Sequence, residues 1–406
     1  MRILLVIQWC RPEPDFKCIP LAKALERDGH QVQVLTGFPN YPGGVVYKGY
    51  RVRWNQREII DGIDVLRVPL YPSHSQSAVG RALNYASFGM SSAVLGAWRV
   101  RPADIAFVYN PQGLPGITLK WFRGIPFVFD IQDLWPDSLG AAHMVSSRFL
   151  LAPVALAMRF FYHQAARICV LSDGFKRVLC ERGVPEEKIA VVYNWADESV
   201  FFPREPDPEL SARFQRSASV NLVYAGNMGR PQALDVVLDA ARRLRADSAD
   251  ICFHLMGRGT ERVRLERAVH AQGLENVRFL ASAPAAEAAR VLASADALFV
   301  HLAPQPLFEI TIPSKIQSYM AMRRPLIAGV SGDAANLVRR AGCGIVFEPG
   351  SGEQLAVAAR QFAALSPTER ASLGAAGRDY YERNLSLRTA AKRYQDLFSL
   401  ARSEEH

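Results

Sequence analysis

Long uninterrupted hydrophobic runs are missing from this chain of 406 residues. A helix that spans a bilayer needs about 20 consecutive apolar residues, and no stretch of that length occurs, so no spanning helix is expected. The amino terminus, MRILLVIQWC, is apolar only as far as Gln8. It is too short for the apolar core of a secretory signal and lacks a cleavage-like tail. The sequence therefore predicts a cytoplasmic protein whose first strand begins near Arg2.

Paired cysteines and metal-ligand spacings are also missing. The six cysteines stand at positions 10, 18, 169, 180, 252 and 343, without a CxxC pair. This scatter is typical of reduced, buried thiols and does not fit a disulfide framework or a zinc site. His254 and His301 lie in apolar runs without ligand spacing, so we expect hydrogen-bonded core histidines there.

Acidic residues are fewer than basic ones, which leaves a net charge of +9. Such a balance fits nucleic acid, an anionic membrane surface or acidic substrates. No interleaving of aromatic and basic residues of the RNA-binding type occurs. The sequence therefore favours a membrane or phosphate-bearing partner and predicts no nucleic acid partner.

An alternation of strand and helix patterns runs along the chain twice. Short apolar runs typical of buried parallel strands alternate with helical spacings over residues 1–195 and again over 219–385. Residues 196–218, which contain several prolines, are predicted to be a linker. A last helix in 386–406 is predicted to pack back on the first domain. The predicted fold is α/β, with two doubly wound Rossmann-like domains and a ligand in the cleft at the carboxyl ends of their strands.

The stretch Leu307–Pro325 contains the strongest local signal for a binding site. Pro313, Ser314 and Lys315 open a helix after a loop. Proline suits the first turn of a helix, and the unpaired N–H groups there attract an anion. An ordinary strand-helix-strand unit with a solvated lysine is the alternative.

The second half of the chain contains, in this order, Tyr224–Gly229 (YAGNMG), Gly257–Gly259 (GRG) and Pro313–Lys315 followed by Tyr-Met-Ala. Together with the paired domains, these segments resemble glycosyltransferase family 4, and the resemblance covers essentially the whole chain. The resemblance implies the GT-B fold, a nucleotide-sugar donor and retention of anomeric configuration. The branch it resembles most is the L-fucosamine transferases of bacterial surface polysaccharides, through the segments Pro12–Pro14, Thr36–Gly44, Val68–His74 and Asp130–Asp137.

This resemblance implies a function and its partners. The expected donor is a UDP-sugar carrying an N-acetylated deoxyamino sugar such as L-FucNAc. The expected acceptor is a saccharide linked to polyprenyl diphosphate, in O-antigen or capsule synthesis. A non-catalytic nucleotide-sugar-binding or scaffold protein, and a GT-B UDP-sugar epimerase, are the alternatives.

The donor residues follow from the charge that develops on the departing diphosphate, which preorganised donors and cations must stabilise. The candidates for the diphosphate are Lys315, Ser314 with the helix start, and Arg230, for which a solvated surface role is the alternative. We expect the donor pocket to include Gly226, Asn227, Gly257 and Arg258 as well. No acidic pair of the DxD type follows a strand, so no metal ion or other cofactor is expected.

The chain departs from the family pattern at several donor positions. Asn227 and Gln232 stand where most relatives have an arginine and a lysine. The paired glutamates of the family fall on Ile310 and Ser318. Glu309 lies one residue before Ile310, and Gln317 has the same spacing from it. We expect Glu309 to reach the donor sugar as a catalytic residue, and Ser318 or Gln317 to bond the ribose.

The acceptor side is expected to use polar residues of the first domain. Gln132 takes the place of a histidine found in many relatives, and Asp133 is expected to orient the acceptor hydroxyl as a catalytic residue. Glu13, Asn40 and Asn110 are further acceptor-side candidates. An exposed carboxylate at Glu13 and a rigid surface loop around Asn40 are the alternatives.

Two expected helices, Arg81–Val100 and Ser146–Ala166, combine large apolar side chains with arginines. Such a mixture suits a surface that lies on a membrane and meets a polyprenyl-diphosphate acceptor. We therefore expect peripheral contact with the inner face of the cytoplasmic membrane. Packing of both helices inside the first domain is the alternative.

Overall fold

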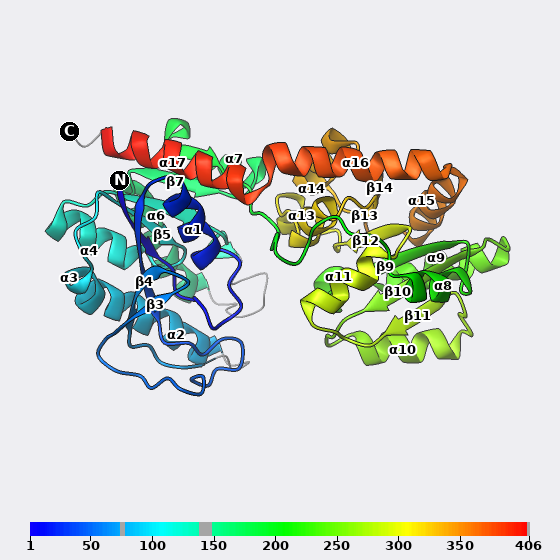
Figure 1. Cartoon of the computed structure of the whole chain (residues 1–406), viewed down its shortest axis with the longest axis horizontal. Coiled ribbons are helices and arrows are strands. Elements are labelled where there is room, and N and C mark those ends of the chain that lie inside the picture. Colours follow the sequence, from blue (N-terminus) through cyan, green and yellow to red (C-terminus); the bar gives the residue numbers. More distant parts are fainter. Residues whose placement is uncertain (74–77, 138–147, 404–406) are drawn as a thin grey trace. The chain divides into compact units, whose positions relative to one another are not determined.

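The computed structural model describes residues 1–73, 78–137 and 148–403. Contacts divide the chain into two compact units (Figure 1). Unit 1 comprises Met1–Tyr193 with Leu387–His406, and unit 2 comprises Asn194–Ser386. Residues 196–218, which were predicted to be a linker, lie within unit 2. They contain helix α8 (Pro208–Gln215), whose Phe214 is buried against the ring of His254.

Unit 1 is built on an eight-stranded sheet of order β3-β4-β2-β1-β5-β6-β7-β8. All neighbours are parallel except the β3–β4 hairpin. The strands are β1 (Arg2–Val6), β2 (Gln31–Gly37), β3 (Gln56–Ile60), β4 (Ile63–Val68), β5 (Ile105–Tyr109), β6 (Phe127–Ile131), β7 (Arg167–Val170) and β8 (Ile189–Val191). The helices are α1 (Cys18–Arg27), α2 (Ala78–Ser91), the π-helix η1 (Ser92–Gly96), α3 (Ala97–Arg99), α4 (Gly113–Arg123), α6 (Arg148–Gln164), α7 (Asp173–Glu181), the 3₁₀ turn η2 (Glu186–Lys188) and α17 (Leu387–Ser403).

Strand alternation sends neighbouring residues of this sheet to opposite faces, and helices cover both. Phe107 of β5 contacts the rings of Tyr394 and Phe398 in α17. Phe127 and Phe129 of β6 lie in register with Ala106 and Val108, and therefore point to the other face. There Phe129 meets Phe161 of α6, at 6.3 Å between ring centroids. The first domain is therefore a doubly wound sheet, as predicted.

Unit 2 is built on a six-stranded, fully parallel sheet of order β11-β10-β9-β12-β13-β14. Its strands are β9 (Val220–Ala225), β10 (Ile251–Met256), β11 (Val277–Leu280), β12 (Ala297–His301), β13 (Leu326–Gly329) and β14 (Gly344–Phe347). Its helices, besides α8, are the 3₁₀ turn η3 (Arg230–Gln232), α9 (Asp235–Ala246), α10 (Arg262–Ala271), α11 (Ala285–Ala293), α12 (Pro306–Glu309), α13 (Ser314–Ala321), α14 (Gly332–Ala341), α15 (Gly352–Ala364) and α16 (Pro367–Asn384). The strand order reverses between β9 and β12, where open α/β sheets bind their ligands.

One predicted helix is interrupted in the structure. The helix expected over Arg81–Val100 becomes α2, a π-helical turn and the short α3. The last helix expected in 386–406 is α17, which Leu385 and Ser386 separate from α16. The helix expected over Ser146–Ala166 is α6, and the first two residues of that range lie outside the described part of the chain.

A buried ion pair joins three elements of unit 1 that are far apart in sequence. The Nζ atom of Lys17, just before α1, lies 2.7 Å from the carboxylate of Asp130 in β6. The hydroxyl of Tyr394 in α17 donates to the other carboxylate oxygen at 3.0 Å. The ammonium also lies over the rings of Phe107, Tyr109 and Tyr394. The side chains of the pair are 3% and 0% exposed, so neither charge reaches bulk water.

We expect Lys17→Met to lower the free energy of unfolding of unit 1 by about 3–5 kcal/mol, because it leaves the carboxylate of Asp130 buried without its cation. Urea denaturation followed by circular dichroism measures the change. Lys23→Met, at an exposed position of the same helix, is the matched control and should change stability by less than about 0.5 kcal/mol. Equal stability of the Lys17 variant and wild type would contradict a structural role for this pair.

Candidate functional site

A pocket of about 500 Å³ lies at the carboxyl end of the second sheet. The segments that follow β9, β10 and β11 line it together with the first turns of α13. Seven of the predicted donor residues meet there: Gly226, Asn227, Gly257, Arg258, Ser314, Lys315 and Ser318. The structure thus brings together residues that are far apart in sequence, such as Gly226 and Ser318.

Main chain forms the inner wall of this pocket, because glycines allow strand ends to approach closely. Gly226 has a φ of 142°, and a Cβ there would lie 2.6 Å from Cε of Lys315. Gly257 has a φ of 146°, and a Cβ there would lie 1.8 Å from the carbonyl oxygen of Gly226. Side chains of L-residues rarely adopt such angles. Both positions therefore favour glycine for their conformation, and Gly257 requires it for space as well.

Lys315 is the principal charged group of the pocket. Its Nζ atom lies 5.0 Å from the ring centroid of Tyr224, and its stem rests on Gly226. Among the residues that the structure describes, no carboxylate lies within ion-pair distance of this ammonium. Burial lowers the pKa of Lys315 to about 8, because desolvation disfavours the charged form. An anionic ligand would supply the missing counter-charge.

The start of helix α13 adds unpaired donors beside this lysine. Pro313 precedes the helix in an extended conformation and gives no side-chain cap to its first N–H groups. Ser314 is exposed, and the hydroxyl of Ser318 donates to the carbonyl of Ser314 at 3.2 Å. Helix geometry places positions 314, 315 and 318 on one side, since residues three and four apart are neighbours. Together they form a site suited to phosphate.

The remaining lining residues position the strand ends. The Nε atom of Arg258 donates to the hydroxyl of Ser282 at 3.0 Å. Asn227 donates to Gln232 at 3.3 Å, which tethers the loop after β9 to η3. The hydroxyl of the buried Tyr319 lies 3.3 Å from the main-chain nitrogen of Ala225. This bond fixes α13 against the end of β9.

Three predicted donor residues lie outside the pocket lining. Arg230 is 90% exposed in its side chain, and its closest acidic partner is Glu261 at 3.8 Å. Glu309 is exposed at the end of α12, where its main-chain carbonyl lies against Gly332. Gln317 is buried, and its side-chain amide lies 2.9 Å from the carbonyl oxygen of Pro313. Position 317 is two residues from Lys315, which turns it to another side of the helix.

Two of the predicted acceptor-side residues, Glu13 and Asn40, lie in one cluster of loops. Both carboxylate oxygens of Glu13 accept main-chain N–H groups, from Cys10 at 3.2 Å and from Asn40 and Tyr41 at 2.7 Å each. Burial raises the pKa of Glu13, and these three hydrogen bonds oppose the rise. Asn40 accepts from the amide of Asn84 at 3.2 Å. Both residues therefore hold loops in place in the described structure.

The other acceptor-side residues follow β5 and β6. Asn110 is 3% exposed, and its amide oxygen and nitrogen have no partner among the described residues. Gln132 donates to the carboxylate of Asp130 at 2.5 Å. Asp133 is exposed. Of the predicted acceptor residues, Asp133 and Asn110 are thus the two whose polar groups remain available to a ligand.

The rings that shape the pocket of unit 2 were not predicted from the sequence. Tyr224 lies under the ammonium of Lys315, and Tyr319 anchors the helix that carries it. Tyr224 was part of the motif YAGNMG, but the motif did not indicate what its ring contacts. Phe201 lines the pocket from the expected linker. Only the tertiary structure brings that segment to β9.

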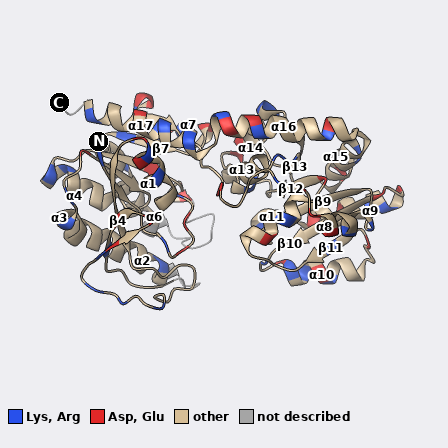
Figure 2. Ribbon diagram, in the orientation of Figure 1, with Lys and Arg blue, Asp and Glu red and all other residues tan. Residues whose placement is uncertain are grey.

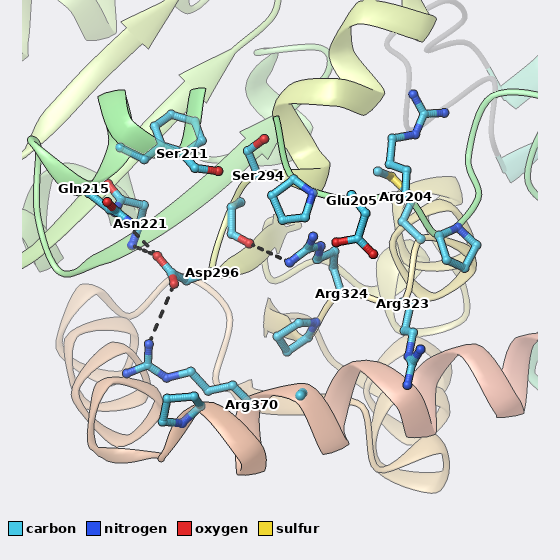
Figure 3. Close-up of a pocket in the computed structure, with 18 of the residues that line it drawn as sticks. Arg204, Glu205, Ser211, Gln215, Asn221, Ser294, Asp296, Arg323, Arg324 and Arg370 are labelled. Carbon is cyan, nitrogen blue, oxygen red and sulfur yellow. Dashed lines mark hydrogen bonds and ion pairs between the residues drawn. The ribbon is translucent and has the colours of Figure 1, made fainter. Parts of the chain in front are cut away.

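A second cavity, of about 710 Å³, lies at the opposite, amino edge of the same sheet (Figure 3). None of the predicted site residues lines it. Asp296 accepts the main-chain N–H of Asn221 at 2.8 Å and lies 3.8 Å from Arg370, as the dashed lines show. Arg324 donates to the carbonyl of Ala295 at 3.4 Å and faces Glu205. In this cavity acidic and basic side chains thus lie next to each other. The ammonium of Lys315 in the first pocket, in contrast, has no acidic partner among the described residues.

Three of the described side chains that could each ligate a metal ion lie close together. Atoms of Cys10, Asp15 and Cys18 lie within 4.8 Å of one another. Asp15 accepts the N–H groups of Cys18 and Ile19 at 2.6 and 2.9 Å, as a cap of α1 does. Burial raises the pKa of the Cys18 thiol well above its usual value. In this structure Asp15 thus caps the start of α1 beside two free thiols.

The expectation of hydrogen-bonded core histidines is met by both ring nitrogens of His301 and by one ring nitrogen of His254. His301 has both ring nitrogens engaged, with the carbonyl of Gln232 at 2.7 Å and the N–H of Gly350 at 2.9 Å. His254 contacts the side chain of Asn221 at 2.9 Å through one nitrogen, while the other has no partner among the described residues. Burial lowers the pKa of His254 to about 4, so the ring is neutral at physiological pH.

A parallel sheet with a glycine-walled pocket and an uncapped helix start at its carboxyl edge is the arrangement in which open α/β sheets bind nucleotides. The comparisons with known proteins agree. Residues 20–195 match the family described as glycosyl transferase 4-like domain, and residues 219–364 match glycosyl transferases group 1. The chain belongs to the family 4 glycosyltransferases of GT-B fold and is a transferase enzyme.

Relatives of this chain include proteins of polysaccharide synthesis. It is 27% identical over 91% of its length to WcaI of Escherichia coli K12, named as a colanic acid biosynthesis glycosyl transferase, of which it covers 92%. The Anabaena protein HepE, solved with UDP and glucose, is 17% identical with a TM-score of 0.67, over 98% of this chain and 99% of that one. WaaG, a glycosyltransferase involved in lipopolysaccharide biosynthesis, is 16% identical with a TM-score of 0.61, over 98% and 99%. The two structures show the shared fold.

We expect binding of UDP to weaken as the pH rises through about 8. Lys315 carries its charge below its pKa of about 8 and loses it above, so the attraction for a diphosphate is present at pH 6.5 and fades by pH 9.5. Titration calorimetry across this range measures the change. Lys315→Arg keeps its charge and should show a nearly flat profile. A flat profile for wild type would contradict a phosphate contact at Lys315.

Proposed function

We propose that this chain transfers a sugar from a UDP-sugar, with retention of anomeric configuration, to a saccharide carried on a lipid diphosphate in surface-polysaccharide synthesis. The observation that carries the proposal is the ammonium of Lys315, which lies in a nucleotide-sized pocket on Gly226 and over Tyr224 without an acidic partner among the described residues. The UDP and glucose in the HepE structure and the polysaccharide role in the name of WcaI support it.

The proposed chemistry depends on the charge of the leaving group. When the C1–O bond of the donor breaks, negative charge gathers on the departing diphosphate. Lys315 and the uncapped N–H groups of α13 lie at one end of the pocket and would stabilise that charge. In this proposal no metal ion is needed for transfer, and the leaving phosphate takes the proton of the acceptor hydroxyl. An N-acetylated deoxyamino sugar such as L-FucNAc is the proposed cargo.

A radiolabelled transfer assay tests this proposal. Purified protein is given UDP-sugars in turn, with and without a chelator, and with an acceptor of diphosphate-linked N-acetylhexosamine on a short lipid. We expect transfer that survives the chelator, and a product whose anomeric configuration in NMR matches the donor. Lys315→Ala should lower turnover at least about tenfold, the effect of losing a charge-assisted contact of about 1.5–3 kcal/mol.

The control variant and the alternatives give distinct outcomes. Arg267→Ala, at an exposed position of α10 outside the pocket, should keep the wild-type rate. UDP binding without any turnover would instead support the scaffold alternative. Conversion of the UDP-sugar without an acceptor would support the epimerase alternative.

An exposed apolar surface on unit 1 supports the lipid part of the proposal. Trp98 of α3, Trp121 and Phe122 of α4, and Leu156 of α6 are each between 57% and 71% exposed. Ring contacts make the surface continuous, with Trp98 6.1 Å from Phe122 and Trp121 5.9 Å from Phe160. Large exposed apolar patches mark interaction surfaces. We name these five residues the apolar face.

The charged residues within the helices of the apolar face, and within the neighbouring α2, have one sign. Helices α2, α3, α4 and α6 contain arginine and lysine but no aspartate or glutamate. Figure 2 shows these helices largely tan, with basic segments at α3 and α4. Basic residues beside apolar rings suit an anionic lipid surface. No helix in the described part of the chain is long and apolar enough to cross a membrane, and we propose contact with the bilayer surface instead.

We expect Trp98→Ala combined with Trp121→Ala to lower binding to vesicles that contain anionic phospholipid by more than tenfold, because each large ring contributes about 1.5–3 kcal/mol when it leaves water. Vesicle sedimentation measures the partition. Trp54→Ala, at a 75% exposed position outside the apolar face, is the control and should bind as wild type does. Unchanged binding by the double variant would exclude the apolar face as the lipid contact.

A further inference from the structure

Four aromatic side chains form a connected cluster in unit 1. The ring of Trp9 lies 5.3 Å from that of Tyr41 and 5.9 Å from that of Tyr85, and Tyr85 lies 5.6 Å from Trp135. Trp9, Tyr41 and Trp135 stand in the segments that follow β1, β2 and β6, and Tyr85 stands in α2. All four are partly exposed, whereas core rings such as Phe107 are fully buried. We name these four residues the aromatic platform.

The aromatic platform lies at the carboxyl edge of the first sheet, where open α/β sheets place their ligands. The strands β2, β1, β5 and β6 are consecutive neighbours in the sheet. The segments after three of them carry rings of the platform, and Asn110 follows the fourth. One ligand could therefore contact groups from all four.

Buried amides hold the rings in place from behind. Gln8, Asn40 and Asn84 are each at most 4% exposed, and each directly precedes a platform ring. Gln8 donates to Asn84 at 2.6 Å, and Asn84 donates to Asn40 at 3.2 Å. Gln112 extends this network by donating to Gln8 at 2.8 Å. A satisfied buried network is rigid, so the rings are preorganised.

Polar groups accompany the platform. The amide of Asn110 is buried and has no hydrogen-bond partner among the described residues, which costs free energy unless a ligand completes it. Burial raises the pKa of the Tyr85 hydroxyl, and the nearby carboxylate of Asp133 raises it further. An amide and a carboxylate beside flat rings match the hydroxyl groups and the apolar C–H face of a pyranose.

From this arrangement we infer that the aromatic platform binds the sugar ring of the acceptor. The rings of Trp135 and Tyr85 stand at 89° to each other, so one of them stacks on the C–H face of the sugar while the other borders its edge, and Asn110 and Asp133 bond its hydroxyls. The inference rests on the proposed transfer reaction and adds the place and the chemistry of acceptor recognition. The buried amides Gln8, Asn40 and Asn84 are positioning residues, which act through the rings that follow them in sequence.

Steady-state kinetics with the short-lipid acceptor of diphosphate-linked N-acetylhexosamine tests the inference. We expect Tyr85→Leu and Trp135→Leu each to raise the KM for this acceptor at least about tenfold, while the KM for the UDP-sugar stays within twofold. Tyr85→Phe and Trp135→Phe keep a flat ring and should restore most of the acceptor affinity. Asn84→Leu should raise the acceptor KM in the same way if the amides position the rings.

The controls separate recognition from folding and from the proposed function itself. Trp54→Leu removes an exposed ring outside the platform and should leave both KM values unchanged. Circular dichroism melting shows whether a variant is folded, and UDP binding shows whether unit 2 is intact. An unchanged acceptor KM, or a raised KM for the donor instead, in folded Tyr85 and Trp135 variants would overturn the inference. Absence of transfer by wild type would overturn the proposed function instead.

Discussion

The buried pair of Lys17 and Asp130 is the interaction on which unit 1 depends. An ammonium and a carboxylate without water are tolerated only when each finds its partner and further hydrogen bonds. Tyr394 supplies one of those bonds from α17, more than 260 positions away from Asp130. The last helix is thereby part of the first unit. The same pair lies at β6, directly before the segment that carries Asp133 and Trp135.

Unit 2 depends on a different constraint, the contact between main-chain atoms at its strand ends. A Cβ atom at Gly257 would collide with the main chain of Gly226, and a Cβ atom at Gly226 would collide with the side chain of Lys315. Lys315 rests on this contact and on the ring of Tyr224, and helix α13 is fixed by Tyr319. The positive charge is therefore held by apolar and main-chain groups. It remains available for a ligand because no acidic side chain of the described residues neutralises it.

The sequence allowed prediction of the fold and of seven of the residues that meet in the pocket of unit 2, since the signals for both are local. Strand periodicity, glycines after strands and a proline before Ser314 and Lys315 each depend on a few neighbouring residues. Gln317 was assigned by its spacing from Glu309 and Arg230 by its charge, but the direction of each side chain depends on helix phase and on partners elsewhere. The amide network of Gln8, Asn40 and Asn84 could not be predicted, because its members meet only through the tertiary fold. The catalytic roles expected for Glu309 and Asp133 stay predictions.

The glycine wall of the donor pocket limits how this enzyme can be altered, in evolution or by design. A wall of main-chain atoms leaves no side chain to exchange at Gly226 or Gly257. Changes in the shape of the pocket must therefore arise at its rim, where Ala283 and Ala288 are small and partly exposed. A library directed at those two positions would vary the shape of the pocket while preserving the strand contact that holds Lys315.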